Sequence, residues 1–323
     1  MVPNENKSPQ DKIMVKNACA LLNSGGGVLK MVISDYEEID DFWDQLDKTW
    51  QPFEQKLTNL VKPLTYNDVF DRRVIKPKEI HLFINAPQHL CTIHSNLYFA
   101  GDAGTYEASF EQAVNMLQNL GKNFSNYVDA PLKDLPNLPK EFTYKEKLDY
   151  HETRRIQFKY FTQEDPILRS RCQQDDVQKH ISAFGNTIGG EILLGVTNYR
   201  EVLGVDMKKN SQNKIEEQVN SMIKTMKFPV TPRRSVHWDI EFIPVSGDTT
   251  TTQERAVVAI KVAGMKNLGG VFMKRPESYE LLDHDTIQVI EFDQWKRRML
   301  SGSKLETDTK GCPFLFIINR LLF

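Results

Sequence analysis

The feature that most constrains the fold is an internal repeat. The segment KNACALLNSGGGVL (residues 16–29) aligns with KHISAFGNTIGGEI (residues 179–192) at a constant offset of 163 residues. The identical pairs are Lys16 and Lys179, Ala20 and Ala183, Asn23 and Asn186, Gly26 and Gly189, and Gly27 and Gly190. In both segments a helical spacing of apolar residues leads into a polar, glycine-rich turn and then a strand-like run. We interpret the repeat as two lobes of related fold; a chance likeness of two ordinary helix–glycine–strand units is the alternative.

Segments around the repeat alternate between helical and strand patterns. Helices are predicted at 13–22, 36–60, 109–121, 176–186, 211–226 and 293–300, and strands at 28–34, 80–84, 97–99, 191–196, 239–245 and 256–262. The helix at 211–226 is expected to begin with Ser211 as its N-cap, and the last two strands are expected to pair. This alternation predicts a mixed α/β (α+β) fold.

A proline-containing stretch marks the expected boundary between the lobes. Pro131, Pro136 and Pro139 favour extended backbone between the two halves. The expected domains are a disordered leader at 1–12, an N-lobe at 13–128, a linker at 129–145, a C-lobe at 146–303 and an apolar tail at 304–323. The sequence leaves the structure of the tail open.

Composition narrows the class of protein. The chain has 323 residues, of which 40% are apolar and 26% charged, with a formal net charge of -2. Its four cysteines are widely spaced without a CxxC pair, which argues against a disulfide scaffold and favours a reducing compartment. No apolar run reaches the roughly 18–20 residues that span a bilayer, and the N-terminus lacks the apolar part of a signal peptide. We expect an intracellular protein; the residues leave cytosol and nucleus open, and our working assignment is the cytoplasm.

One stretch concentrates the candidate chemistry. Glu152, Gln157 and Asn198 are expected to face one pocket. Metal-assisted phosphodiester cleavage needs clustered carboxylates to hold a divalent cation, and one carboxylate with two amides is a poor magnesium site. Residues 151–234 hold 14 Lys/Arg against 10 Asp/Glu, which makes this the net-basic section of the chain. The candidate RNA-binding residues are Arg154, Arg155, Lys159, Arg169, Arg171, Lys208 and Lys209.

On these motifs the sequence resembles the Schlafen family, in particular its short members. The likeness is carried by NACALLNSGGGVLKM (17–31), ETRRIQFKYF (152–161), HISAFGNTIGGEILLGVTN (180–198), VLGVD (202–206) and FMKRPESYELL (272–282). The resemblance implies a Schlafen core, with two AlbA-like lobes in a horseshoe around a positively charged valley and a C-lobe of the AlbA_2 type. It also implies tRNA and rRNA binding, endoribonuclease activity in some members, and control of growth, T-cell quiescence and immune regulation by short members.

The chain departs from the family pattern at the pocket and at a metal site. Active family nucleases carry three acidic residues, at positions matching Glu152, Gln157 and Asn198, and two of these are amides here. Many members also hold a zinc ion, but the equivalent regions at 228–232 and 268–270 contain neither Cys nor His. The resemblance therefore implies a disarmed pocket, and we expect no metal site, no structural zinc and no other cofactor.

Three hypotheses follow. In the first, the chain is a Schlafen core that binds structured RNA, tRNA foremost, without cleaving it, and acts as a regulator. In the second, it is a weak tRNA or rRNA endoribonuclease that uses Mg²⁺ or Mn²⁺ and Glu152 with another carboxylate, such as Asp206 or Glu191. In the third, it is a protein-interaction regulator with no RNA role. The oligomeric state stays open in all three.

Overall fold

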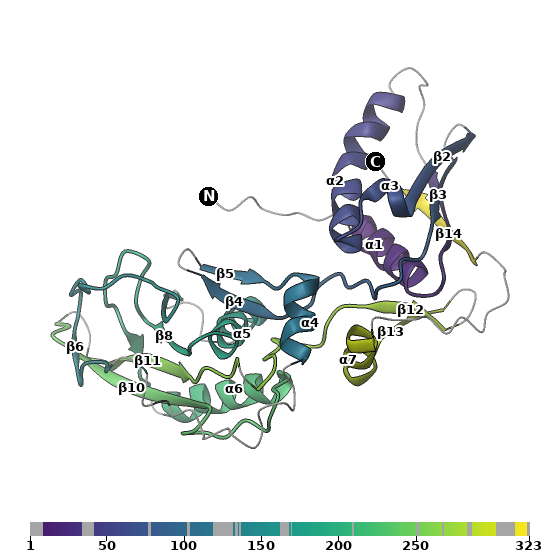
Figure 1. Cartoon of the computed structure of the whole chain (residues 1–323). Coiled ribbons are helices and arrows are strands. Elements are labelled where there is room, and N and C mark those ends of the chain that lie inside the picture. Colours follow the sequence, from purple (N-terminus) through teal and green to yellow (C-terminus); the bar gives the residue numbers. More distant parts are fainter. Residues whose placement is uncertain are drawn as a thin grey trace. The chain divides into compact units, whose positions relative to one another are not determined.

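The chain forms two compact units of mixed α/β structure, which confirms the predicted fold class (Figure 1). The computed structural model describes residues 9–33, 42–76, 79–101, 104–118, 132, 135, 137–161, 168, 170–208, 210–249, 252–266, 268–282, 286–301 and 314–321. Unit 1 comprises Met1–His94 and Pro276–Phe323, and unit 2 comprises Ser95–Arg275.

Unit 1 is built on a four-stranded sheet with the order β14-β1-β3-β2. Its strands are β1 (Gly27–Ile33), β2 (Phe70–Lys76), β3 (Glu79–Ile84) and β14 (Phe314–Leu321). Strand β14 runs parallel to β1, and the other neighbours are antiparallel. The helices are α1 (Pro9–Leu22), α2 (Phe42–Val61), α3 (Tyr66–Val69) and α7 (Phe292–Ser301), and α7 follows the hairpin β12 (Tyr279–Leu281) and β13 (Ile287–Val289).

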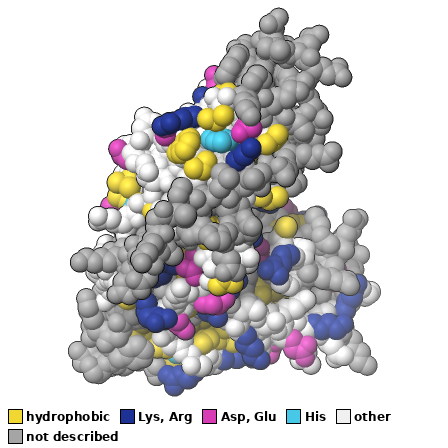
Figure 2. All heavy atoms as spheres, turned by 90° about the vertical axis from the view of Figure 1, so that its right-hand side faces the viewer, with side chains coloured by type: hydrophobic (Ala, Val, Ile, Leu, Met, Phe, Trp, Pro, Cys, Tyr) yellow, Lys and Arg dark blue, Asp and Glu magenta, His cyan; other side chains and the backbone are white. Residues whose placement is uncertain are grey.

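Only one face of the unit 1 sheet contributes to the described hydrophobic core. Ile80, Leu82 and Ile84 of β3 are buried against α1 and α2, because alternate residues of a strand point to the same face. His81 and Phe83 lie on the opposite face and are partly exposed. Figure 2 shows hydrophobic side chains beside a histidine in the upper part of the molecule, with Lys or Arg and Asp or Glu near them.

Unit 2 contains a larger sheet with the order β6-β10-β11-β8-β7, and β9 pairs with β11. Its strands are β6 (Phe142–Thr143), β7 (Ile156–Lys159), β8 (Gly190–Leu194), β9 (Val205–Asp206), β10 (Trp238–Ser246) and β11 (Arg255–Val262). The hairpin β4 (Tyr98–Gly101) and β5 (Gly104–Glu107) leads into α4 (Phe110–Gln118), and α5 (Arg171–Gly185) and α6 (Ser211–Thr225) complete the unit. Strands β10 and β11 pair, as predicted, and they run antiparallel.

Both faces of the unit 2 sheet are packed. Ile192 and Leu194 of β8 pack with residues of α5 and α6 in one hydrophobic cluster. Leu193, between them, belongs to a second cluster that includes Phe142 and Leu148. The segment 137–150 therefore supplies a second covering layer, and β7 and β8 form a parallel pair between two apolar layers.

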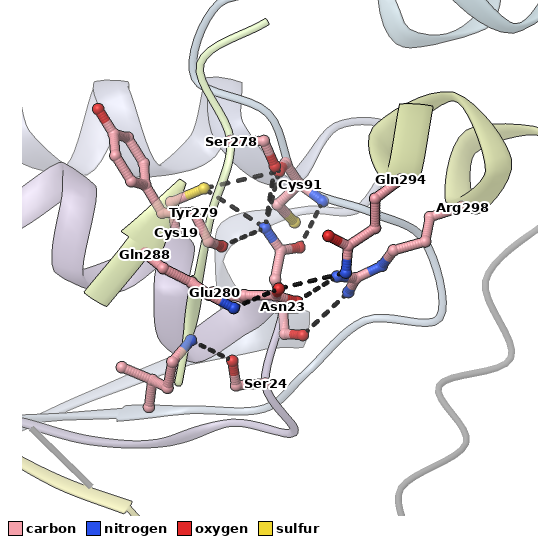
Figure 3. A network of polar contacts seen from close by, with 11 residues as sticks. Cys19, Asn23, Ser24, Cys91, Ser278, Tyr279, Glu280, Gln288, Gln294 and Arg298 are labelled. Carbon is pink, nitrogen blue, oxygen red and sulfur yellow. Dashed lines mark hydrogen bonds and ion pairs between the residues drawn. The ribbon is translucent and has the colours of Figure 1, made fainter. Parts of the chain in front are cut away.

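The sequence repeat corresponds to the same hydrogen-bonded turn in each unit. In unit 1, Asn23 follows α1; its Nδ2 donates to Cys91 O (2.9 Å) and Tyr279 O (2.8 Å), and its Oδ1 accepts from Cys91 N (2.8 Å) (Figure 3). In unit 2, Asn186 follows α5; its Nδ2 donates to Val271 O (2.8 Å) and Tyr98 O (2.9 Å), and its Oδ1 accepts from Val271 N (2.7 Å). One buried asparagine thus joins the helix end to two distant segments in each unit.

Further side chains correspond across the repeat. Cys19 Sγ donates to Cys91 O (3.5 Å), and Ser182 Oγ donates to Val271 O (2.6 Å). Lys16 Nζ lies 4.9 Å from the centre of the Tyr279 ring, and Lys179 Nζ lies 5.2 Å from the centre of the Tyr98 ring. Because both tyrosines begin a hairpin that precedes a helix, the repeat extends beyond the fourteen aligned residues and supports a duplicated unit.

The turn geometry shared by the two units requires glycine in both copies. Gly26 and Gly189 have φ values of +91° and +82°, in the left-handed region that a side chain disfavours. A Cβ atom on Gly26 would meet Ile84 O, and a Cβ atom on Gly189 would lie 2.8 Å from Val262 O. Ile84 and Val262 are the last residues of β3 and β11, the antiparallel neighbours of β1 and β8. The absence of a side chain on the glycine therefore lets the turn approach the sheet.

Several details differ from the expectations. Residues 95–118 belong to unit 2 and residues 276–301 belong to unit 1. The boundaries between the two units therefore differ from the expected lobe boundaries at 128 and 303. Helix α1 begins at Pro9, inside the expected leader, and part of the tail forms β14. The expected N-cap of α6 was wrong: Asn210, with left-handed φ of 68°, precedes Ser211, which is the first helical residue. Most of the expected linker before residue 137 lies outside the described residues.

Candidate functional site

The predicted site lies around the edge strand β7 of unit 2. Among the described residues, strand β7 pairs with β8 on one side only, so alternate main-chain groups point away from the sheet. Glu152 is exposed, and its Oε1 accepts a hydrogen bond from Phe158 N at 2.9 Å. The carboxylate of Glu152 therefore satisfies an N–H of the open strand edge.

Gln157 occupies β7 itself and is buried, with 7% of its surface exposed. Its Nε2 donates to Thr153 O (3.2 Å) and Ile156 O (3.1 Å). A carboxylate at this position would bring an acceptor toward two carbonyl oxygens that now receive N–H donors, and buried acceptors without donors are costly. The amide of Gln157 is thus part of the local hydrogen bonding.

Asn198 lies in the turn after β8 and is exposed. The segment that carries Glu152 runs beside this turn: Leu148 N donates to Arg200 O (2.9 Å), and Arg200 Nη1 lies 3.1 Å from His151 Nε2. The structure therefore brings the two segments together, and Glu152 lies on the segment that leads into β7, the strand that contains Gln157. His151 and Arg200 were not singled out from the sequence, because only the long-range pairing of the two segments reveals their contact.

The predicted cationic residues fall into different environments. Lys159 Nζ lies 2.9 Å from Asp176 Oδ2, so a carboxylate of α5 already balances its charge. Arg171 is 84% exposed, and its Nε lies 3.7 Å from Asp175 Oδ1, a contact that solvent weakens. Arg154 and Lys208 are also exposed, and Arg155 is partly buried. Arg169 and Lys209 lie outside the described residues.

The other two carboxylates considered for catalysis are held by cations. Asp206 Oδ1 lies 3.2 Å from Nε of the largely buried Arg255. The Glu191 side chain is fully buried on the sheet face opposite α5, and Lys261 Nζ lies 3.9 Å from its Oε1. Burial raises the pKa of Glu191 to about 7, and the Lys261 charge opposes this rise.

The neighbours of Glu191 form a polar group inside the second cluster of unit 2. Lys261 Nζ also lies 2.7 Å from Glu241 Oε2, so the lysine is shared between two carboxylates. Burial raises the pKa of Tyr150, with a smaller contribution from the charge of Glu191. Within the ranges that the structure describes, no three His, Cys, Asp or Glu side chains gather as a metal-binding group.

Comparison with known proteins identifies the domain that contains this site. Residues 152–278 match the family model described as Schlafen, AlbA_2. This chain carries a Schlafen AlbA_2 domain. The chain is also 25% identical over 302 residues to the Poxin-Schlafen protein of cowpox virus (strain Brighton Red). That alignment covers 85% of this chain and 56% of the relative, so the chain spans little more than half of the viral protein's length.

The comparisons confirm the relationship to the Schlafen family inferred from the motifs. The matched region begins at Glu152 and contains β7, α5 and β8, which carry or flank all three predicted pocket residues. In the described part of the chain, no helix is both long and apolar enough to cross a membrane.

Proposed function

We propose that this chain binds structured RNA, tRNA foremost, through its phosphates and does not cleave it. The observation that carries the proposal is the amide of Gln157, which donates to two main-chain carbonyl groups. By the family resemblance, an active nuclease has a carboxylate at this position. Here the local structure is built around an N–H donor, which supplies neither a negative charge for a metal nor a general base.

The remaining pocket residues support the same conclusion. The one carboxylate, Glu152, accepts the Phe158 N–H, and Asn198 is neutral. A magnesium site prefers carboxylate oxygens in a defined octahedral arrangement. One engaged carboxylate and two amides give a divalent cation little electrostatic stabilisation.

Binding draws on the exposed cations of the net-basic section. Arg154, Arg171 and Lys208 extend into solvent, where a phosphate needs only charge and reach. Lys159 contributes less, because Asp176 neutralises it. In this proposal the chain is a cytoplasmic, non-catalytic regulator that shields the RNA it holds, and the family resemblance suggests growth and T-cell quiescence as its setting.

A gel-shift titration with tRNA over a series of salt concentrations tests the proposal. Wild-type protein is expected to bind, with affinity that falls steeply as salt rises. The triple variant Arg154→Gln, Arg171→Gln and Lys208→Gln is expected to lower the slope of log affinity against log salt by about 3. Arg73→Gln in unit 1, where Arg73 is paired with Asp71 and 61% exposed, is the matched control and should leave the slope unchanged. Absence of any shift at low salt contradicts the proposal.

A weak metal-dependent endoribonuclease is the second candidate, favoured by the exposure of the Glu152 carboxylate. Incubation of tRNA with Mg²⁺ or Mn²⁺ and separation on a denaturing gel tests it. Cleavage that Glu152→Ala abolishes supports this candidate, and intact tRNA at every metal concentration dismisses it. The double variant Gln157→Glu and Asn198→Asp adds a check: restored cleavage shows that only charge was lost, and failure shows that the surroundings also differ.

A protein-interaction regulator without an RNA role is the third candidate, favoured by the net charge of -2. A pull-down from cells before and after RNase treatment separates it from RNA binding. Partners that persist after RNase support it, and partners that disappear support RNA binding.

A further inference from the structure

The turn after β8 presents one aromatic side chain to solvent. Tyr199 is 82% exposed, the largest value among the exposed large hydrophobic side chains of the described residues. The apolar ring of an aromatic residue at this exposure makes no packing contribution to either hydrophobic cluster of unit 2. The position of the Tyr199 ring therefore depends on the backbone of the turn that carries it.

Hydrogen bonds on both sides of Tyr199 fix that backbone. Thr197 N donates to Glu201 O (3.0 Å), Arg200 N donates to Thr197 O (2.8 Å), and Glu201 N donates to Thr197 Oγ1 (3.1 Å). Val196 and Val202, which flank the turn, are both buried and bridge each other. Arg200 closes the turn with a left-handed φ of 71°. A rigid turn thus displays the ring, so little conformational entropy is lost when a ligand covers it.

The surroundings of the turn suit an anionic ligand. Arg200 Nη1 and His151 Nε2 lie 3.1 Å apart, and both residues are on adjoining segments of the site. The main chains of Lys147 and Glu201 form an antiparallel β-bridge, and Lys147 is exposed. An exposed aromatic ring on a turn that also carries an arginine matches the way proteins bind unpaired nucleotides, with the ring against a base and the cation against a phosphate.

We infer that Tyr199 is a base-stacking residue that holds an unpaired nucleobase of the bound RNA. The inference rests on the proposed RNA-binding function and adds a ligand class to it: a loop, bulge or single-stranded end rather than a continuous duplex. Stacking is tolerant of sequence because every base has a π-face, so this contact selects unpaired structure and not a particular base.

The test uses a full-length chain and two RNA probes, a hairpin with 2-aminopurine in its unpaired loop and a fully paired duplex of the same stem. Tyr199→Ala is expected to weaken binding of the hairpin by about 5- to 100-fold and to leave the salt dependence unchanged, because no charge is removed. Tyr199→Phe keeps the ring and should stay within about twofold of wild type. Wild type and Tyr199→Phe should quench the 2-aminopurine fluorescence, and Tyr199→Ala should not.

The possible outcomes separate this inference from the proposed function. If wild type binds the hairpin and Tyr199→Ala binds equally well, base stacking is overturned and RNA binding stands. An equal loss on hairpin and duplex also overturns base stacking. Absence of binding by wild type overturns both. A pull-down after RNase treatment adds a last outcome. If Tyr199→Ala loses a protein partner that wild type retains, and its RNA affinity is unchanged, the ring contacts a protein instead.

Discussion

Units 1 and 2 share one hydrogen-bonded turn but differ in what surrounds their sheets. Asn23 and Asn186 make matching bonds to two distant segments, and Gly26 and Gly189 make matching approaches to a neighbouring strand. The described core of unit 1 packs on one sheet face, whereas unit 2 has a cluster on each face. The shared turn therefore accounts for the scaffold that the two units have in common. The additional layer at 137–150 belongs to unit 2, which is also the unit that carries the candidate site.

Removal of the two asparagines tests whether the shared turn is equivalent in the two units. Asn23→Ala and Asn186→Ala each remove the asparagine partner of one main-chain N–H and one carbonyl oxygen, so each should lower the free energy of unfolding by about 3–4 kcal/mol. Denaturant titration measures this loss, with Asn213→Ala on the exposed side of α6 as a control expected to change it by under about 0.5 kcal/mol. A loss below about 1 kcal/mol in one unit alone would show that the turn is not equivalent in the two units.

Glu191 tests the difference between the two sheets, because the matching residue of unit 1 is Val28. The folded-state pKa of about 7 lies above the ordinary value of 4.5, so folding favours the protonated carboxyl. Its contribution to stability is greatest below pH 4.5 and is lost as pH rises through 7. Glu191→Gln should therefore gain stability relative to wild type between pH 5 and pH 8, by up to about 3 kcal/mol.

Unfolding titrations at pH 5 and pH 8 measure this gain. Glu241→Gln is the matched control, because Glu241 contacts the same lysine but is largely exposed. Its effect should be under about 1 kcal/mol and change little with pH. A stability difference for Glu191→Gln that does not vary with pH would show that Glu191 is ionised in the folded protein across this range.

The glycines test the close approach of each turn to its sheet. Gly26→Ala and Gly189→Ala combine a left-handed backbone with a Cβ atom against a carbonyl oxygen, and each should cost about 2 kcal/mol or more. Gly104 also has a positive φ, of +132°, but open space surrounds its Cβ position. Gly104→Ala should cost about 1 kcal/mol from backbone strain alone, and equal losses at all three positions would remove the role of the close approach.

The smallest expected effect comes from the residue four positions before each asparagine, Cys19 in unit 1 and Ser182 in unit 2. Ser182→Cys replaces a 2.6 Å hydrogen bond to Val271 O with the weaker donor that unit 1 uses, and should cost about 1 kcal/mol. The exposed Cys172→Ser is the control for sulfur chemistry and should not change stability. A loss much above 1 kcal/mol would indicate that unit 2 does not tolerate the unit 1 donor.

The sequence predicts the repeat because its key residues are local: helix, asparagine, glycine and strand follow each other within fourteen positions. It does not predict which hairpin completes each turn, since Asn23 bonds to Tyr279, which is 256 residues away. The pocket residues were found by pattern, but the amide donation of Gln157 and the neutralisation of Lys159 by Asp176 depend on side-chain positions that no local pattern encodes. Tyr199 was missed because an exposed aromatic residue is visible only once the turn around it is known.

The central claim, that RNA is held by unit 2 at the segments around β7 and the turn after β8, is tested most directly by crosslinking. The full chain bound to tRNA is irradiated with ultraviolet light, and the crosslinked peptides are mapped by mass spectrometry. The account predicts crosslinks in residues 147–161 and 197–208, with Tyr199 among the modified positions. Crosslinks confined to unit 1, or their absence from both of these segments, would contradict it.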